Sequence, residues 1–221
     1  MPLITIVGAG SGLGIEIARA FGNEGFDVAL VARTQSNLDS LVTTLESEGI
    51  RARGFTADVS APATITSALA AIKAELGPID VLEFSPADRS LAPANVLEVT
   101  PENLQPQIDF YIGGALSAVG AVLPDMIAAG AGTVLITTGG GSINPRPAFG
   151  TIGIATAGLR NWTLNLHNAL RDKGVYVAYV AISALIGAGH PDAEPTVIAK
   201  AYVDLYQARQ DSELNYVVDD H

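Results

Sequence analysis

The sequence predicts a doubly wound α/β fold, in which a mostly parallel sheet of about seven strands lies between two layers of helices. Short runs rich in Val, Ile and Leu alternate with longer segments of helical period, a pattern typical of a parallel sheet that is buried on both faces. A glycine-rich turn separates the first apolar run from the first helical segment. Apolar residues make up 48% of the chain and charged residues 16%, which allows a large core and excludes global disorder.

Seven apolar runs are the expected strands. They are Leu3–Val7, Asp27–Ala32, Arg53–Thr56, Val81–Ser85, Thr133–Thr138, Val175–Ile182 and Tyr216–Val218. Because parallel strands end at the same edge of a sheet, loops at their carboxyl ends are expected to build any binding site.

Helix signals fill the gaps between these runs. After the glycine-rich turn, helices are expected at about 36–49, 62–77, 101–129, 151–172 and from about 195 onward. Ser36 followed by Asp39 resembles a capping box, and Thr100 with Pro101 marks another helix start. No linker, repeat or low-complexity segment divides residues 1–221, so a single domain is predicted.

Charge and composition exclude several classes of function. With 12 basic and 23 acidic residues, the net charge of -11 would repel a nucleic acid backbone and an anionic bilayer. The chain has no cysteine, which excludes disulfides, thiolate metal sites and cysteine nucleophiles. No basic leader precedes the first strand, so a cytoplasmic location is expected.

One long apolar segment raises the alternative of a membrane-spanning helix. Between Phe110 and Pro145 the only charged residue is Asp125. Glycines and Pro124 divide the segment into pieces shorter than the roughly 20 continuous apolar residues that a spanning helix needs. A buried helix followed by a buried strand is therefore expected, and no membrane partner.

The glycine-rich turn is the strongest motif, since it follows a strand and opens a helix. Glycines allow a tight turn and close backbone approach, and the amide groups at a helix start attract a pyrophosphate. The turn predicts a dinucleotide site, the alternative being merely a tight strand-to-helix connection. The candidate binding residues of the turn are Gly8, Gly10, Ser11, Gly12, Leu13 and Gly14.

The end of the second strand indicates which dinucleotide is bound. Dinucleotide folds that prefer NAD carry an acid there to hold the ribose hydroxyls, but this chain has Ala32 followed by Arg33. A guanidinium suits a 2′-phosphate, so the expected cofactor is NADP. The alternative is that Arg33 is an ordinary exposed arginine.

The glycine spacing Gly8-x-x-x-Gly12-x-Gly14 resembles that of the short-chain dehydrogenase/reductase family, whose fold is of the Rossmann type. The similarity extends along nearly the whole chain, and it implies further cofactor-binding residues. Asp58 and Val59 match the family's Asp-Val after strand three. Ser85 and Ala87 belong to Phe84-Ser85-Pro86-Ala87, which stands where the family has Asn-Asn-Ala-Gly. The remaining two are Thr156, and Ile186 in the turn after strand six.

The same resemblance places the catalytic positions and shows that two have changed. The family uses a Tyr-x-x-x-Lys pair, a Ser and an Asn. Here Ile152 falls at the tyrosine, Thr156 at the lysine, Thr138 at the serine and Tyr111 at the asparagine. None of the three lysines stands four residues after a tyrosine, so the pair is absent in every register.

Two functions remain open from the sequence. The first is a divergent short-chain oxidoreductase that uses NADP(H) on a small carbonyl or alcohol, with Thr138 and Tyr111 as candidate catalytic residues. The second is a catalytically inactive NADP(H)-binding protein that acts as a sensor or as an oligomer partner. Tyr111 has a structural alternative, a ring packed between helices.

Three further polar side chains are weaker candidates for a binding role. Ser142 and Arg146 lie on the loop that lines the substrate cleft in the resembled family, where they would bind an anionic group or simply face water. His167 is expected at a helix surface or interface and not as a ligand, and no metal site is expected. The resemblance implies a homodimer or homotetramer through the two apolar helices, with Trp162 or Leu166 near the contact.

Overall fold

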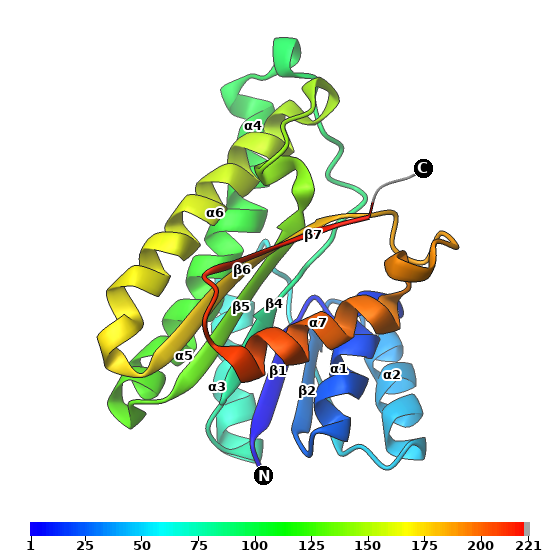
Figure 1. Cartoon of the computed structure of the whole chain (residues 1–221), viewed down its shortest axis with the longest axis vertical. Helices are drawn as coiled ribbons and strands as arrows, with labels where there is room; N and C mark the ends of the chain where they lie inside the picture. The colour runs from blue at the N-terminus through cyan, green and yellow to red at the C-terminus, as the bar shows by residue number, and fades with distance from the viewer. Residues whose placement is uncertain (219–221) are drawn as a thin grey trace.

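A seven-stranded sheet forms the centre of the computed structural model, which describes residues 1–218 (Figure 1). The strand order is β3-β2-β1-β4-β5-β6-β7, and every neighbouring pair is parallel. The strands are β1 (Leu3–Val7), β2 (Asp27–Ala32), β3 (Ala52–Thr56), β4 (Val81–Phe84), β5 (Gly132–Gly139), β6 (Val175–Ser183) and β7 (Glu213–Val217). The predicted α/β class is confirmed.

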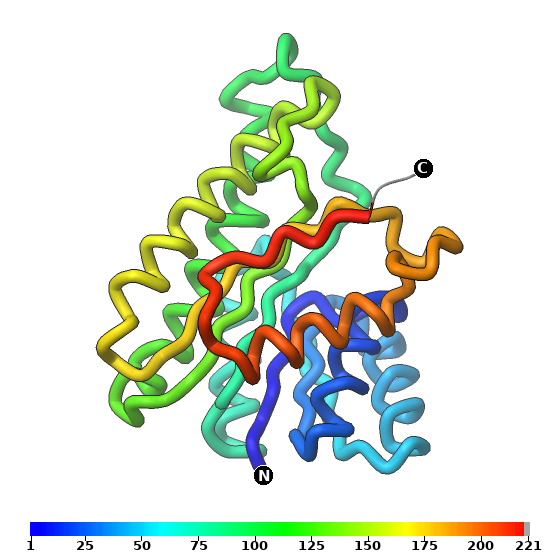
Figure 2. Tube along the Cα trace, viewed as in Figure 1, coloured from blue at the N-terminus to red at the C-terminus, as the bar shows by residue number. Residues whose placement is uncertain are grey.

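Helices cover both faces of the sheet and give the molecule three layers (Figure 1). They are α1 (Leu13–Asn23), α2 (Gln35–Ser47), α3 (Pro62–Leu76), α4 (Pro101–Gln107), α5 (Gly114–Ala129), α6 (Gly150–Leu170) and α7 (Pro195–Ala208). One apolar core lies between the sheet and α1, α2 and α7, and the other between the sheet and α3, α5 and α6. The trace in Figure 2 shows α7 returning from the far end of the chain to lie beside α1, which it contacts.

Two details of the predicted elements were wrong. Strand β7 begins at Glu213, three residues before the predicted start at Tyr216. The capping box at Ser36 does not form, because α2 already begins at Gln35 and Ser36 lies inside the helix. A capping box forms instead at the start of α4, where Thr100 and Asn103 bond each other's backbone amides.

A continuous helical stretch of 29 residues, Pro101–Ala129, contains the first part of the apolar segment. It comprises α4, a π-helical turn over Ile108–Gly113, and α5. By length and composition alone it would reach across a bilayer, but α5 packs on β4, β5 and α3, and several of its side chains lie in the core. The predicted buried strand is confirmed by β5, whereas α5 buries only one face and leaves Leu116 and Ile127 more than a third exposed.

The sheet changes winding direction between β1 and β4, which are neighbours although two strands separate them in the sequence. The helices that follow β1 and β2 cover one face of the sheet, and the helices that follow β4 and β5 cover the other (Figure 1). In open α/β sheets ligands bind at such a switch point, outside the carboxyl ends of the strands. A ligand site is therefore expected between the turn after β1 and the segment after β4.

Candidate active site

The turn after β1 is held tightly between its neighbours at the switch point. Gly8 has φ +100°, and a Cβ atom there would lie 2.5 Å from the Cα atom of Pro86. The amides of Gly8 and Ala9 both donate to the carbonyl of Val31, at 2.9 and 3.0 Å. A side chain at position 8 is thus excluded by both backbone conformation and space.

The start of α1 offers unfilled amide groups next to this turn. Gly12 is the N-cap residue and no side chain caps the helix. Gly10 and Gly12 have open space around them, whereas a Cβ at Gly14 would lie 3.1 Å from the Cα of Ala9. Free amides at the end of a helix dipole form a site for an anionic group such as a pyrophosphate.

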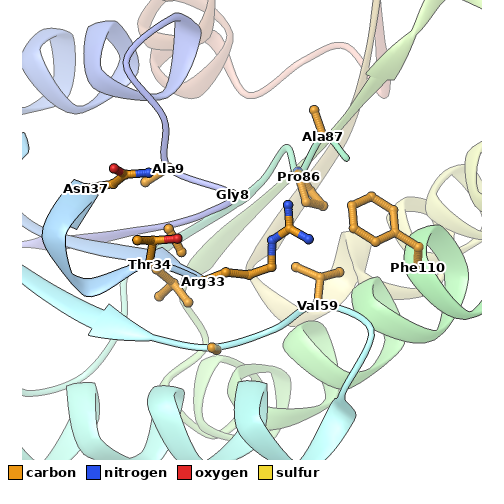
Figure 3. A pocket seen from close by; sticks show the side chains of 12 residues that line it. Gly8, Ala9, Arg33, Thr34, Asn37, Val59, Pro86, Ala87 and Phe110 are labelled. Atoms are coloured by element: carbon orange, nitrogen blue, oxygen red, sulfur yellow. The ribbon is translucent and has the colours of Figure 1, made fainter. Parts of the chain in front are cut away.

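A pocket lies beside the turn and joins the ends of β1, β2 and β4 (Figure 3). Its lining residues are Gly8, Ala9, Val31, Ala32, Arg33, Thr34, Asn37, Ala57, Val59, Pro86, Ala87 and Phe110. Four predicted cofactor-binding residues, Gly8, Arg33, Val59 and Ala87, are brought together there. Asn37 and Phe110 were missed, because only the fold shows that α2 and the π-helical turn reach this pocket.

Among the described residues that line the pocket, Arg33 is the one with a cationic side chain. Figure 3 shows its guanidinium extending from the end of β2 into the space between Pro86 and Val59. Its Nη1 lies 2.6 Å from a carboxylate oxygen of Asp88, in the loop after β4. Ala32 beside it carries no acid, so the lining presents a cation without the carboxylate that would hold ribose hydroxyls.

Asp58 and Ser85 support the pocket without being part of its lining. The Asp58 carboxylate accepts a hydrogen bond from the amide of Ser60 at 2.9 Å, which shapes the loop between β3 and α3. The amide of Ser85 donates to the carbonyl of Val7 at 2.9 Å, extending the contact between β4 and β1. The Ser85 hydroxyl donates to Glu83 at 2.8 Å.

Glu83 is a fully buried carboxyl on the central strand β4. Besides Ser85, its partner is the hydroxyl of Thr137 on β5 at 3.0 Å, and Thr137 in turn lies 2.8 Å from the hydroxyl of Tyr202 on α7. Burial raises the pKa of Glu83 to about 8, although both hydrogen bonds act in the opposite direction. The feature of the sequence that points to this network is a single charged residue, Glu83, inside the apolar run that forms β4.

A second group of hydroxyls lies at the end of β5. The Thr138 hydroxyl contacts the phenol of Tyr179 on β6 and donates to the carbonyl of Gly139 at 3.1 Å. The Tyr179 phenol also donates to the main-chain carbonyl of Thr156 at 3.3 Å. Burial raises the pKa of Tyr179 above its ordinary value. Tyr179 therefore holds Thr138 in place as a neutral hydroxyl and is the main residue that sequence reasoning missed.

Tyr111 lies in the π-helical turn and is partly buried. Its ring packs edge-on against Phe110 at 5.1 Å between centroids, which favours the structural alternative. Burial, and then the charge of Asp88, raise the pKa of Tyr111. A phenol with a raised pKa keeps its proton at neutral pH and is a poor general base.

A comparison with protein families identifies the chain. Residues 2–186 match the family model described as short chain dehydrogenase. The chain belongs to the short-chain dehydrogenase/reductase family. This confirms the resemblance expected from the glycine spacing and the seven-stranded fold.

Individual relatives are distant and mostly longer than this chain. Pig "Dehydrogenase/reductase SDR family member 4" is 29% identical over 171 residues, which cover 77% of this chain and 61% of the relative. The chain thus spans about six-tenths of the length of that curated relative.

Solved structures confirm the fold over the whole chain. L-sorbose reductase from Gluconobacter frateurii, complexed with NADPH and L-sorbose, has a TM-score of 0.85 at 20% identity and covers 99% of this chain and 95% of its own. A metagenomic short-chain oxidoreductase in complex with NADP has a TM-score of 0.86 at 24% identity, covering 100% and 98%.

Ile152 and Thr156, the positions assigned to the family's tyrosine and lysine, lie four residues apart on α6. Ile152 has no proton to donate. The Thr156 hydroxyl is buried and donates to the carbonyl of Ile152 at 2.8 Å, so its hydrogen-bonding capacity is used within the helix. Neither side chain supplies a charge or an acid to the end of β5.

The remaining candidates are placed outside the pocket. Ile186 lies in the loop after β6 with 40% of its surface exposed and is not part of the pocket lining. Ser142 donates to Gly139 at 3.3 Å, and Arg146 is exposed beside it on the same loop. His167 bonds the carbonyl of Val177 through Nδ1 at 2.6 Å. Within residues 1–218 no group of three His, Cys, Asp or Glu side chains is arranged to hold a metal ion.

Proposed function

We propose that the protein binds NADP(H) at the switch point and acts as an oxidoreductase on a small carbonyl or alcohol, with an atypical active site. The observation that carries the choice of cofactor is Arg33, a cation in the lining of the pocket, next to Ala32 where an NAD-preferring site has an acid. Two solved members of the fold, described above, are complexes with NADPH or NADP, which supports this proposal.

The bound nicotinamide would supply or accept the hydride. The chain's contribution is to bind the dinucleotide phosphates at the start of α1 and to offer the Thr138 hydroxyl, which would turn from the Gly139 carbonyl to the carbonyl oxygen of the substrate. Tyr179 orients that hydroxyl through their contact. A polarising donor contributes about 10²–10³ in rate, and a positioned acid about 10²–10⁴. Since Ile152 and Thr156 provide no acid, slow turnover is expected.

A second function is favoured by the same two residues. The Thr156 hydroxyl is bonded within α6 and Ile152 is apolar, so the chain has no proton donor at either position. A protein that binds NADP(H) without turnover, as a sensor or as the partner of an active subunit, fits this observation equally well. Turnover on a panel of aldehydes and ketones at high protein concentration separates the two functions.

Assembly is proposed from the apolar faces of α5 and α6. Leu116, Ile127 and Ile154 are large apolar side chains on these helices with more than a third of their surface exposed. Covering such faces with a second copy would remove apolar area from water. We propose a homodimer or homotetramer built through these helices.

Isothermal titration with NADP and NAD tests the cofactor assignment. A charge-assisted hydrogen bond contributes about 1.5–3 kcal/mol, so NADP is expected to bind roughly 10- to 100-fold more tightly than NAD. Arg33→Asp should remove this preference. Arg51→Asp is the matched control, because Arg51 pairs with Asp27 at the opposite end of β2. Equal affinities for the two dinucleotides in the unmodified protein would refute the assignment.

A further inference from the structure

The charge of Arg33 is already partly compensated within the chain. Arg33 follows β2 and Asp88 follows β4, 55 positions further along the chain, yet their side chains form an ion pair of 2.6 Å at the pocket. Figure 3 shows the Arg33 side chain extending across the pocket toward the segment of Pro86 and Ala87, which immediately precedes Asp88. The pair therefore spans the space between the two strand ends.

Asp88 is a fixed anion and not a mobile surface carboxylate. Its Oδ1 atom accepts hydrogen bonds from the amide and the hydroxyl of Ser90, at 2.8 and 2.6 Å, and its side chain is 9% exposed. These bonds, followed by the charge of Arg33, hold the pKa of Asp88 below its ordinary value. The side chain of Arg33, in contrast, is 53% exposed. The carboxylate stays in place and charged at neutral pH while the guanidinium has freedom to turn.

We propose that Asp88 is a cofactor-specificity residue that competes with the 2′-phosphate of NADP for Arg33. This inference rests on the proposed function. A 2′-phosphate bound by Arg33 would meet a fixed carboxylate within ion-pair distance of the same guanidinium, and like charges at such separation repel. NAD has no phosphate at this position, so Asp88 weakens the binding of NADP selectively.

The size of the effect follows from the exposure of the pair. Ion pairs between partly exposed side chains change an equilibrium constant by at most about fivefold. Removing the charge of Asp88 should therefore tighten NADP by up to about fivefold and leave the affinity for NAD unchanged.

Calorimetric titration of the Asp88→Asn variant with NADP and NAD is the test. Asparagine keeps a carbonyl oxygen for the amide of Ser90, so the loop retains its main hydrogen bond. Asp27→Asn is the matched control, since it removes one negative charge from an ion pair that lies at the far end of β2. The control should leave both affinities unchanged. In an Arg33→Ala background, Asp88→Asn should tighten NADP less than it does in the unmodified protein, because the competition for the guanidinium is absent.

The outcomes separate this inference from the proposed function. If the unmodified protein binds neither dinucleotide, the proposed function fails. If it prefers NADP but Asp88→Asn leaves that affinity unchanged, weakens it, or tightens NAD equally, the competition is refuted and the assignment of NADP stands. Thermal unfolding of each variant verifies folding. Should Asp88→Asn unfold, Asp88→Ser provides the same measurement with a shorter neutral side chain.

Discussion

The amino-terminal and carboxyl-terminal strands of this sheet build the candidate site from different parts of the chain. At the end of β1 the site is made of backbone: Gly8 is fixed against Pro86, and the amides at the start of α1 are free. At the end of β5 it is made of side chains, those of Thr138 and its contact Tyr179. Position 8 excludes a side chain because of its backbone conformation and its close neighbours, whereas a site made of side chains can change residues while the backbone keeps its path.

The hydroxyls at the second site are hydrogen-bonded within the chain, mostly to main-chain carbonyls. Thr138 contacts Tyr179, which donates to the Thr156 carbonyl, while the Thr156 hydroxyl donates to Ile152. Such a closed arrangement stabilises the junction between β5, β6 and α6, but it offers no acid. The first site is built for a ligand, and the second is built largely for packing.

Glu83 lies between the two sites and gives the largest expected effect. Its pKa, about 8 in the folded chain, is raised from the ordinary 4.5, so folding takes up a proton between these values. The free energy of unfolding should therefore fall as pH rises from about 5 to about 8, by up to about 4 kcal/mol. Glu83→Gln should remove this fall and stabilise the protein above pH 8, as measured by urea unfolding across pH.

Glu75→Gln is the control for Glu83, because Glu75 is an exposed glutamate on α3. It should leave the pH dependence of unfolding unchanged. If the free energy of unfolding of Glu83→Gln falls with pH as steeply as that of the unmodified protein, burial does not keep this carboxyl protonated.

Gly8→Ala tests the backbone site. The left-handed conformation and the contact with Pro86 should together lower the free energy of unfolding by about 3 kcal/mol. In a chain of this size that corresponds to a fall of roughly 6–12 °C in Tm. Gly10→Ala, at a glycine with open space around it, should change Tm by less than about 2 °C. Similar losses in both variants would contradict the steric argument.

Rebuilding the catalytic pair tests the side-chain site. Ile152→Tyr combined with Thr156→Lys should raise turnover on aldehydes at least about hundredfold, since a positioned acid contributes that much. Steady-state kinetics with NADPH measures it. The control combines Thr156→Lys with Ile154→Tyr, because Ile154 is exposed on the same helix and would carry the phenol elsewhere. An equal gain in both double variants would mean that the added tyrosine is not acting at position 152.

The difference between the two sites also explains what the sequence could predict. Strand positions and the turn at Gly8 follow from periodicity and glycine spacing, because each depends on residues close together in the chain. Arg33 was found for the same reason, directly after a strand. Its partner Asp88 was missed, since the ion pair joins segments that only the strand order brings together.

Long-range packing hid the remaining residues. Tyr179 looks like one more apolar position of β6 until the structure shows Thr138 and the Thr156 carbonyl around its hydroxyl. Glu83 likewise needed Thr137 and Tyr202 from two other elements. The predicted capping box at Ser36 is wrong for a local reason. The backbone of Thr34 is extended, so Thr34 is the N-cap residue and Ser36 lies inside the helix.

The π-helical turn between α4 and α5 has a consequence for aligning this chain with others. A π turn holds about one residue more than an α turn, so a helix can absorb a single inserted residue there without breaking. Residues before Ile108 are then rotated by about 100° relative to a regular helix that continues into α5. Phe110, and not the neighbouring Tyr111, lines the pocket. A shift of one residue within Ile108–Gly113 thus decides which of these two aromatic side chains reaches the pocket.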